Sequence, residues 1–194
     1  MNDHAVRAAS PGPGSGPGGV VVRSATLADV GALVDLVTSA YRGDASRAGW
    51  TTEADLLDGD RIDPAILRAD VTRPRSKVLV VDDDAGRERT PLACAHVAVS
   101  DGAGYFGMFA VRPERQGAGV GGALLAEAER VARREWGQDV MRMQVISART
   151  DLIAWYVRRG YHRTGELRPF PYGDTRFGLP KRQDLVFEVL EKRL

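Results

Sequence analysis

The 194-residue chain has little of what marks several classes of protein. Its one cysteine excludes a disulfide framework, and its three histidines are scattered, so we expect no metal site. No apolar run reaches the roughly 18 residues of a membrane-spanning helix, and residues 1–10 lack the apolar core of a signal peptide. A net charge of +1 favours neither nucleic acid nor a membrane surface as a partner. A cytoplasmic location is the default expectation.

The chain divides into a tail and one domain. Residues 1–19 end in a run of proline, glycine and serine that has nothing to bury, so we expect this tail to be disordered. The whole chain is 43% hydrophobic and 27% charged, which is ordinary for a globular protein, and its length suits one core. We therefore expect residues 20–194 to form a single domain.

Apolar spacing predicts the order of helices and strands in this domain. The expected strands are 20–23, 77–82, 92–99, 105–111, 140–146, a strand from residue 161, and 184–190. The expected helices are one that Thr26 caps and that extends to Tyr41, short ones at 53–57 and 64–69, and longer ones at 119–135 and 150–159.

The most informative segment is the glycine-rich run 115–122, which lies between an expected strand and an expected helix. Four glycines stand among the six residues 117–122, which is more than a helix cap alone requires. A turn of this kind leaves backbone N–H groups unpaired at the positive end of the helix dipole, where phosphate binds well. Arg112 and Arg115 add positive charge just before the turn. The segment therefore predicts a ligand that carries phosphate.

Residues 117–122 also match the spacing G-x-G-x-x-G of a dinucleotide-binding turn, but their context does not. Residues 112–116 separate the glycines from the preceding strand, whereas a dinucleotide-binding turn follows its strand almost at once. Asp139 precedes the next expected strand instead of ending it. No Lys-Ser or Lys-Thr pair follows the glycines, which excludes a P-loop.

Residues 111–121, V-R-P-E-R-Q-G-A-G-V-G, resemble motif A of the GNAT superfamily of N-acetyltransferases, which reads V-x-P-x-x-R/Q-G-x-G-x-G/A between a strand and a helix. The expected order over residues 20–194 is similar to that family too: strand, two helices, three strands, helix, strand, helix, two strands. The resemblance implies an α/β (α+β) fold with a central, mixed, mostly antiparallel twisted sheet of six or seven strands and about four helices. It also implies acetyl-CoA as co-substrate and no metal.

The resemblance assigns residues to the binding of acetyl-CoA. Backbone groups of Phe109 and Val111 would hold the pantetheine, with the Phe109 amide facing the thioester oxygen; the Phe109 ring is also compatible with plain core packing. Amides in the glycine turn would hold the pyrophosphate, with cationic side chains nearby. The implied cofactor-binding residues are Phe109, Val111, Arg112, Arg115, Gln116, Gly117, Ala118, Gly119, Val120, Gly121 and Gly122.

Residues 152–161 resemble motif B of the same family, a helix that carries an L/W-Y pair and ends in G-F/Y. Tyr156 stands at the family's general-acid position, where its hydroxyl would protonate the sulfur of CoA. A phenol with a pKa near 10 is protonated at neutral pH, as an acid must be. The alternative is a core tyrosine whose hydroxyl is hydrogen-bonded.

The chain departs from the family pattern at two positions. Arg149 stands where many members have an asparagine that binds pantetheine, and Tyr105 stands where some have a glutamate base. The general base is therefore unassigned, and a water relay would suffice. Side chains that could serve, each with an alternative structural role, are Glu53, Asp55 and His96.

Segments 41–53 and 166–174 are where the family selects its acceptor, and here both mix aromatic and charged residues. Aromatic residues could wall a pocket and a carboxylate, including that of Asp174, could attract a cationic amine. The expected substrate-binding residues are Trp50, Glu53, Phe170 and Tyr172. Loop packing explains the aromatic residues nearly as well. Arg42 and Arg47 equally permit an acceptor that carries a carboxylate.

The leading interpretation is an acetyl-CoA-dependent N-acetyltransferase that acts on a primary amine of a small molecule, by direct attack in a ternary complex. The alternatives are a protein or peptide N-acetyltransferase and a non-catalytic acyl-CoA-binding module. The apolar run 185–190 is compatible with a homodimer and equally with a core strand. The acceptor, the general base and the use of longer acyl groups are left open.

Overall fold

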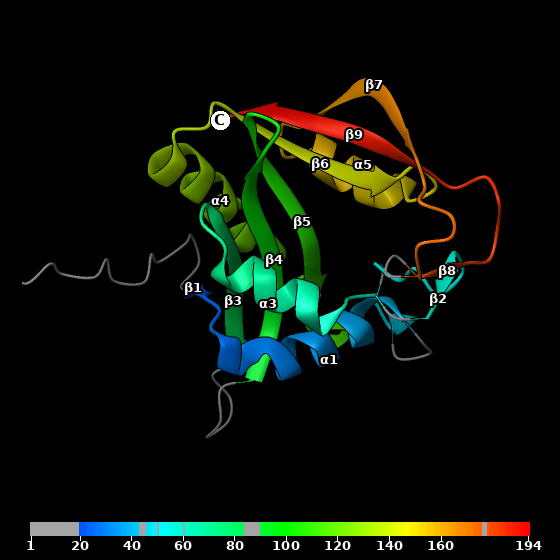
Figure 1. Cartoon of the computed structure of the whole chain (residues 1–194), viewed down its shortest axis with the longest axis horizontal. Helices are drawn as coiled ribbons and strands as arrows, with labels where there is room; N and C mark the ends of the chain where they lie inside the picture. The colour runs from blue at the N-terminus through cyan, green and yellow to red at the C-terminus, as the bar shows by residue number, and fades with distance from the viewer. Residues whose placement is uncertain (1–19, 43–45, 50, 60, 84–89, 176–177) are drawn as a thin grey trace, which may run out of the picture.

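A computed structural model gives the architecture (Figure 1), and it describes residues 20–42, 46–49, 51–59, 61–83, 90–175 and 178–194. The expected tail and Trp50 lie outside the described residues. The helices are α1 (Val30–Tyr41), α3 (Pro64–Thr72), α4 (Val120–Arg130) and α5 (Thr150–Val157). The strands are β1 (Arg23–Ser24), β2 (Leu57–Asp58), β3 (Ser76–Asp83), β4 (Thr90–Ser100), β5 (Ala103–Val111), β6 (Val140–Ile146), β7 (His162–Pro169), β8 (Leu179–Pro180) and β9 (Val186–Arg193).

The centre of the molecule is a seven-stranded sheet with the order β1-β3-β4-β5-β6-β9-β7. Its neighbouring strands run antiparallel, except that β5 and β6 are parallel. Strands β2 and β8 form a separate two-stranded sheet. The expected mixed, mostly antiparallel sheet and its helices are confirmed.

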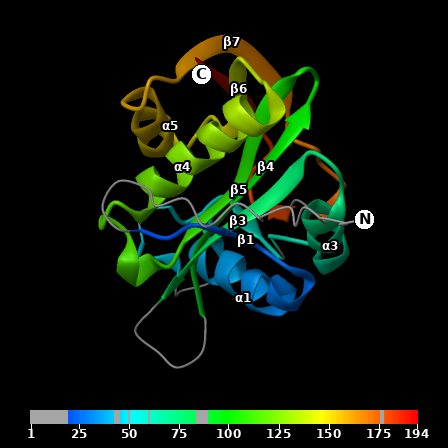
Figure 2. The same cartoon turned by 90° about the vertical axis from the view of Figure 1, so that its left-hand side faces the viewer.

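Helices cover both faces of this sheet, α1 and α3 on one and α4 and α5 on the other (Figure 2). Strand β3 shows how the sequence produces this arrangement, because its side chains alternate between faces. Val78 and Val80 pack with α1 and α3, whereas Leu79 and Val81 pack in the larger cluster with α4 and α5. A strand buried on both faces reads as a continuous apolar run.

Strands β5 and β6 part soon after they meet, and this opens the sheet. Their pairing is limited to Gly104 with Met141 and Tyr105 with Arg142. Further along β5, Met108 and Phe109 lie opposite the single residue Ala95 of β4, and Met108 has a φ of 44°. Such a bulge bends a strand and redirects its backbone groups. The parted strands and the bulge together leave room beside residues 106–111.

Two expectations about the elements need correction. Residues 53–57 do not form a helix; they form a turn in which the amides of Leu56 and Leu57 donate to the carbonyl of Glu53 before β2 begins. A helix that short gains too little from its few hydrogen bonds to form without packing. The last strand begins at Val186 and extends to Arg193, beyond the expected end. The second half of this strand is rich in charged residues, so the apolar pattern did not predict it, yet it pairs with β6 on one side and β7 on the other.

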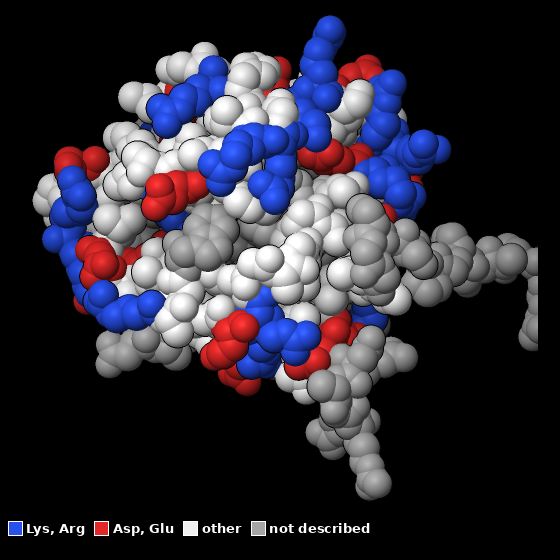
Figure 3. All heavy atoms as spheres, turned by 180° about the vertical axis from the view of Figure 1, so that it is seen from behind, with Lys and Arg blue, Asp and Glu red and all other residues white. Residues whose placement is uncertain are grey.

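Charges of both signs are mixed over the surface. On the face opposite to that of Figure 1, basic and acidic side chains of the described residues alternate, and a group of basic ones lies near the centre (Figure 3). Among the described residues, none of the helices has the length and apolar character needed to cross a membrane.

Candidate active site

The glycine turn before α4 exposes a row of backbone amides. Gly117 and Gly119 have φ of 87° and 82°, values that residues with a Cβ rarely adopt, and Gly119 is the N-cap of the helix. The first backbone bond of the helix joins the amide of Ala123 to the carbonyl of Gly119. The amides from Gly117 to Gly122 have no backbone acceptor among the described residues. They are unpaired donors at the positive end of a helix dipole.

These amides border a cleft of about 420 Å³, which we call the glycine-turn cleft. The side chains on its far wall come from α5 and the residues just after it. The guanidinium of Arg159 lies 3.5 Å from the centre of the Trp155 ring, and burial and the neighbouring Arg158 lower the pKa of Arg159. The lining residues are Thr51, Phe109, Val111, Arg115, Gln116, Gly117, Gly119, Val120, Gly121, Gly122, Asp151, Ala154, Trp155, Arg158 and Arg159. The cleft thus combines unpaired amides with cationic side chains, as a polyphosphate site requires.

Three details of the expected cofactor set change. Arg112 does not line the cleft, because its Nε donates to the carbonyl of Pro91 at 2.9 Å. Ala118 is also absent from the cleft wall. The amide of Gln116 donates to the carbonyl of Pro113 at 3.4 Å, and its side-chain Nε2 donates to Thr51 and Val111. We therefore expect the phosphate-binding amides to begin at Gly117, with Arg158 and Arg159 in place of Arg112.

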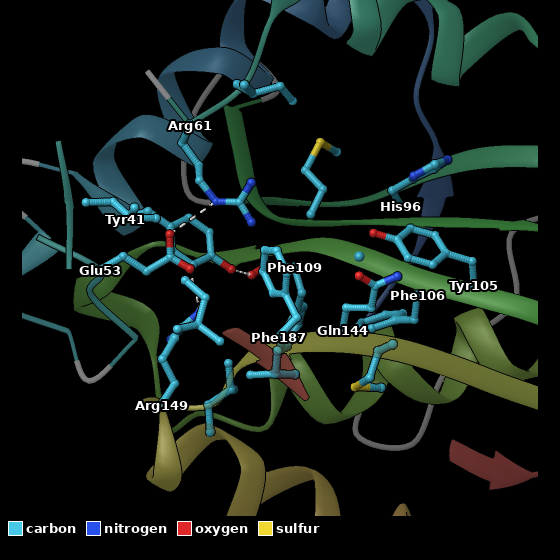
Figure 4. A pocket seen from close by; sticks show the side chains of 18 of the residues that line it. Tyr41, Glu53, Arg61, His96, Tyr105, Phe106, Phe109, Gln144, Arg149 and Phe187 are labelled. Carbon is cyan, nitrogen blue, oxygen red and sulfur yellow. Dashed lines mark hydrogen bonds and ion pairs between the residues drawn. The ribbon is translucent and has the colours of Figure 1, made fainter. Parts of the chain in front are cut away.

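A second hollow, of about 400 Å³, lies where β5 and β6 part, and we call it the central cavity (Figure 4). The exposed edges of the two strands supply its floor, and α1, α3 and the segment between them supply one wall. Its lining residues are Tyr41, Glu53, Leu57, Arg61, Ile62, Asp63, Ile66, Asp70, His96, Tyr105, Phe106, Gly107, Met108, Phe109, Met143, Gln144, Val145, Ile146, Arg149, Leu152, Tyr156, Phe170 and Phe187. Phe109 lines both hollows, so both lie against the bulge of β5.

The backbone of Phe109 is held in place from both sides. The hydroxyl of Tyr41, which is fully buried, donates a short hydrogen bond to the carbonyl oxygen of Phe109. The ring of Phe109 packs on Trp155 and comes so close to Gly121 that a Cβ there would lie 2.8 Å from its Cζ. Gly121 is therefore needed for close packing of α4 on β5. The Phe109 ring packs in the core, and the residue lines both hollows; a role of its backbone in binding acetyl-CoA stays a prediction.

Tyr156 lies in the wall of the central cavity, surrounded by aromatic rings. The centres of the Trp155, Tyr161, Phe106 and Phe109 rings are between 5.1 and 6.4 Å from its own. Burial raises the pKa of Tyr156, so the phenol is protonated at neutral pH. Its hydroxyl has no hydrogen-bond partner among the described residues, unlike that of Tyr161, which donates to Glu129 at 3.0 Å. A hydroxyl left open to the cavity suits a proton donor.

Glu53 lies at one end of the central cavity, inside a cluster of three arginines. Its carboxylate oxygens are 2.8 Å from Arg42, 2.8 Å from Arg149 and 3.3 Å from Arg61. Burial would raise the pKa of Glu53, but these charges outweigh it and lower the pKa below its usual value. Glu53 is 3% exposed. Because three guanidinium groups neutralise this carboxylate, we expect it neither to attract a cationic amine nor to act as a base.

His96 lies at the other end of the cavity (Figure 4), and Asp70, also in the lining, lies beside it. The Nε2 of His96 is 2.9 Å from the Oγ of Ser76 and 3.6 Å from the Asp70 carboxylate. Burial and the charge of Arg73 lower the pKa of His96 to about 4, while burial raises the pKa of Asp70. His96 is therefore neutral at pH 7. Among the three side chains named as candidate bases, His96 alone combines a place in the cavity wall with a neutral ring that can take a proton.

Of the other side chains considered for binding the acceptor or acting as a base, some line the central cavity and others do not. Phe170 is buried in the cavity wall and stacks on Phe187, with ring centres 5.5 Å apart. Tyr172 does not line the cavity; its hydroxyl accepts from the amide of Leu185 and donates to the carbonyl of Arg182, which holds the loop. Asp55 is exposed, pairs with Arg47 and faces away from both hollows. Trp50 lies outside the described residues.

Sequence reasoning missed three cavity residues: Tyr41, Arg61 and Arg149. Tyr41 was expected as an apolar helix position at the start of segment 41–53 and was not singled out there, and Arg149 was expected only as a departure from the family pattern. In the structure Arg149 also donates to the carbonyl of Thr51 at 2.7 Å, so it ties the start of α5 to the segment after α1. Arg149 is 107 residues from Arg42 in the chain, so nothing in the local pattern shows that they meet. The one available signal was the unusual arginine at position 149.

Comparison with known proteins adds to this geometry. A family model described as an acetyltransferase (GNAT) domain matches residues 74–163, which cover β3 to α5. No curated protein sequence matches the chain. Solved structures do match the chain.

Nourseothricin acetyltransferase is 24% identical with a TM-score of 0.52, covering 62% of this chain and 66% of its own. The ribosomal-protein-S18-alanine N-acetyltransferase from Escherichia coli is 15% identical with a TM-score of 0.63, covering 89% and 92%. The PaiA N-acetyltransferase from Thermoplasma acidophilum, solved with coenzyme A, is 14% identical with a TM-score of 0.61, covering 89% and 98%. At these identities the likeness establishes the fold and leaves the acceptor open.

Proposed function

The chain belongs to the GNAT superfamily of acetyltransferases and is an acyltransferase enzyme, and on this premise we propose that it moves the acetyl group of acetyl-CoA to a primary amine of a small molecule by direct attack in a ternary complex. One observation carries the proposal. The unpaired amides from Gly117 to Gly122 open into a cleft that shares the lining residue Phe109 with a second cavity.

The residues present fit acetyl-CoA. Amides without an acceptor at a helix N-terminus bind the diphosphate, and the guanidinium groups of Arg115, Arg158 and Arg159 add charge at the cleft wall. The edge of β5 that β6 leaves unpaired can take an extended chain as an added strand, which suits the pantetheine. A nearby solved structure was obtained with coenzyme A, which supports the same ligand here.

The proposed reaction needs few groups from the protein. Acetyl-CoA supplies the acyl group as a thioester, so transfer breaks its C–S bond, forms a C–N bond and leaves a thiolate. The amide of Phe109, at the bulge, donates to the carbonyl oxygen as negative charge develops on it. The hydroxyl of Tyr41 fixes this residue by bonding to its carbonyl. A fixed donor stabilises charge without reorganising, which is the main electrostatic contribution to such reactions.

Proton transfer is assigned on one side of the reaction. Tyr156, a protonated phenol in the cavity wall, gives its proton to the thiolate. The amine must lose a proton as the C–N bond forms. Water in the cavity takes this proton and passes it to solvent.

A protein acceptor is the second candidate, since one structural neighbour acts on ribosomal protein S18. The size of the central cavity, about 400 Å³, favours a small molecule, because it is near the low end of ligand-sized sites. Homodimer formation and a cytoplasmic location stay predictions.

Release of CoA tests the proposed function. Purified protein is mixed with acetyl-CoA and a panel of small amines and peptides, and free thiol is followed with time. Release that depends on a small primary amine, with an N-acetylated product of the right mass, supports the proposal. Binding of acetyl-CoA without turnover on any acceptor contradicts it and favours the non-catalytic binding module. Turnover limited to peptides would favour the protein acceptor.

A further inference from the structure

The charges of the central cavity are not balanced at the end where Glu53 lies. Arg42, Arg61 and Arg149 surround this one carboxylate, so the cluster has two more positive than negative charges. The other acids of the cavity wall are already occupied. Asp63 accepts from the amides at the start of α3, and Asp70 pairs with Arg73 at 3.2 Å.

Arg61 presents this excess charge to the cavity. Its Nε lies 3.3 Å from a carboxylate oxygen of Glu53 and is buried without a hydrogen bond, and no hydrogen bond joins its two terminal nitrogens to another described residue. Figure 4 shows the guanidinium reaching past Glu53 into the hollow. The Cζ atom of Arg61 lies 4.9 Å from the centre of the Tyr41 ring, and this cation–π contact helps to orient the guanidinium. Burial opposes its charge, but Glu53 outweighs burial and raises the pKa of Arg61, so it is always charged.

A fork of N–H donors that is charged, oriented and unpaired matches a planar oxyanion such as a carboxylate. Leaving such a group unpaired in a partly buried place is costly, and an anion there would remove the cost. Ile62, Ile66 and Phe187 add apolar surface to the cavity lining. Of the two guanidinium groups in that lining, Arg149 already donates to Glu53 and to the carbonyl of Thr51, which leaves Arg61 for the oxyanion.

The fork is also close to the reacting atoms. Arg61 lies over the ring of Tyr41, and the hydroxyl of that ring bonds to the carbonyl of Phe109, whose amide faces the thioester in our proposal. The oxyanion and the amine of the acceptor can then be separated by only a few bonds. A protein N-terminus or a lysine side chain has no carboxylate at that distance.

We infer that the acceptor is an amino-acid-like molecule, a small primary amine with a carboxylate or similar oxyanion near the nitrogen, and that Arg61 determines this specificity by binding the oxyanion. This inference rests on the proposed N-acetyltransferase function. It predicts that a neutral amine of the same shape is a poor acceptor. Arg149 and Arg42 support Arg61 indirectly, because both donate to Glu53 and hold its carboxylate in place.

Matched acceptors test the inference. Release of CoA is measured with α-, β- and γ-amino acids, with the amides of the same acids, with the decarboxylated amines and with aminophosphonates. We expect kcat/KM for the best acid to exceed that for its amide by roughly 10- to 100-fold, as for the loss of a charge-assisted hydrogen bond. Preference for an aminophosphonate would support the oxyanion and change its class. Amides or decarboxylated amines used as well as the acids would overturn the inference while the acetyltransferase function stands.

Variants then locate the effect. Arg61→Gln should lower kcat/KM for the acid by roughly 10- to 100-fold and leave that for the amide and the KM for acetyl-CoA unchanged. Arg61→Lys, which keeps the charge without the fork, should fall between. Arg47→Gln is the control, because Arg47 is exposed and lines neither hollow. Equal losses on the acid and the amide in Arg61→Gln would overturn the role of Arg61.

Binding separates the inference from the function. In calorimetry, the CoA-saturated protein should bind the N-acetylated acid with higher affinity than the N-acetylated amide. The substitution Arg61→Gln should remove this difference in affinity. Equal affinity for both would overturn the inference. If acetyl-CoA binds but no acceptor of any charge releases CoA, the proposed function fails and the inference fails with it. Thermal unfolding of each variant shows that it is folded, since Glu53 keeps Arg42 and Arg149 in Arg61→Gln.

Discussion

Tyr156 and Tyr161 show how two similar side chains differ in what they can do. Both are buried, and their rings lie 5.8 Å apart. The hydroxyl of Tyr161 is used, because it donates to Glu129, whereas that of Tyr156 has no partner among the described residues and lies in the cavity wall. A hydroxyl that makes no hydrogen bond within the protein, on a residue that lines a cavity, is available to a ligand. These contacts therefore support a catalytic role for Tyr156 and a structural role for Tyr161.

The change Tyr156→Phe should lower kcat by about 10²-fold or more, because the thiolate loses its proton donor. The KM for acetyl-CoA and the free energy of unfolding should stay nearly unchanged, since the hydroxyl makes no hydrogen bond with the described residues. Steady-state kinetics and denaturant unfolding measure both quantities. Tyr161→Phe is the matched control, with a stability loss of about 1–2 kcal/mol and little effect on kcat. If Tyr156→Phe kept the kcat of the parent protein, Tyr156 would not be the general acid.

Sequence reasoning could single out Tyr156 because motif B places it by local spacing, and its role as an acid stays a prediction. It had less success with Glu53, which the pattern of residues 41–53 offered as an anion for a cationic amine. The three arginines that neutralise Glu53 come from positions 42, 61 and 149. No local pattern reports a contact between residues so far apart.

At the scale of elements, the start of α4 and the bulge of β5 form one unit. Gly121 allows the helix to pack on the ring of Phe109, and the same helix start exposes the amides that we assign to the diphosphate. The sequence predicted this turn well, since a strand, a proline and four glycines follow in a fixed order. It could not predict where β5 and β6 part, because the register between two strands depends on packing across the sheet.

A methyl group at position 121 should disturb this unit. In Gly121→Ala the new Cβ would lie 2.8 Å from Cζ of Phe109, whose ring is held by Phe106 and Trp155. We expect the KM for acetyl-CoA to rise about 10-fold and the stability to fall by about 1–3 kcal/mol, as for overpacking. Enzyme kinetics and denaturant unfolding measure the two effects.

The control for that change is Gly31→Ala in α1, which is exposed and has no atom within 4 Å of the new Cβ. This variant should be more stable by roughly 0.5–1 kcal/mol, because glycine weakens a helix, and its KM should not change. If Gly121→Ala behaved like Gly31→Ala, the close approach of α4 to β5 would be of no consequence.

On the scale of the whole molecule, the ion cluster around Glu53 joins parts of the chain that are remote in sequence. Arg42 ends α1, Arg149 precedes α5, and Glu53 lies between α1 and β2. Lys181, just after β8, donates to the carbonyl of Ala54 at 2.6 Å and so brings the C-terminal loop to the same segment. These contacts close one wall of the central cavity.

Breaking this cluster should cost stability before it affects chemistry. Glu53→Gln leaves three arginines facing one another around an uncharged amide, and we expect a loss of about 3–5 kcal/mol in the free energy of unfolding. The lowered pKa keeps the Glu53 carboxylate charged at neutral pH, so the loss of stability in Glu53→Gln should be present there. This loss should shrink as pH falls through that pKa, because the parent protein then loses the same charge. Denaturant unfolding between pH 3 and 8 measures it.

The matched control is Asp55→Asn, which removes a carboxylate from the exposed pair with Arg47. Exposed pairs contribute about 0–1 kcal/mol, so this variant should be nearly as stable as the parent. A small loss in Glu53→Gln together with complete loss of activity would instead mark Glu53 as the base, against our account.

The central claim is that the amides from Gly117 to Gly122 bind the diphosphate of coenzyme A. The most direct measurement is a titration of the labelled protein with coenzyme A, followed by amide ¹H–¹⁵N spectra. We predict the largest shifts at Gly117, Gly119 and Gly121, saturating with the ligand. Saturable binding that leaves these amide signals in place, or no binding at all, would contradict the account.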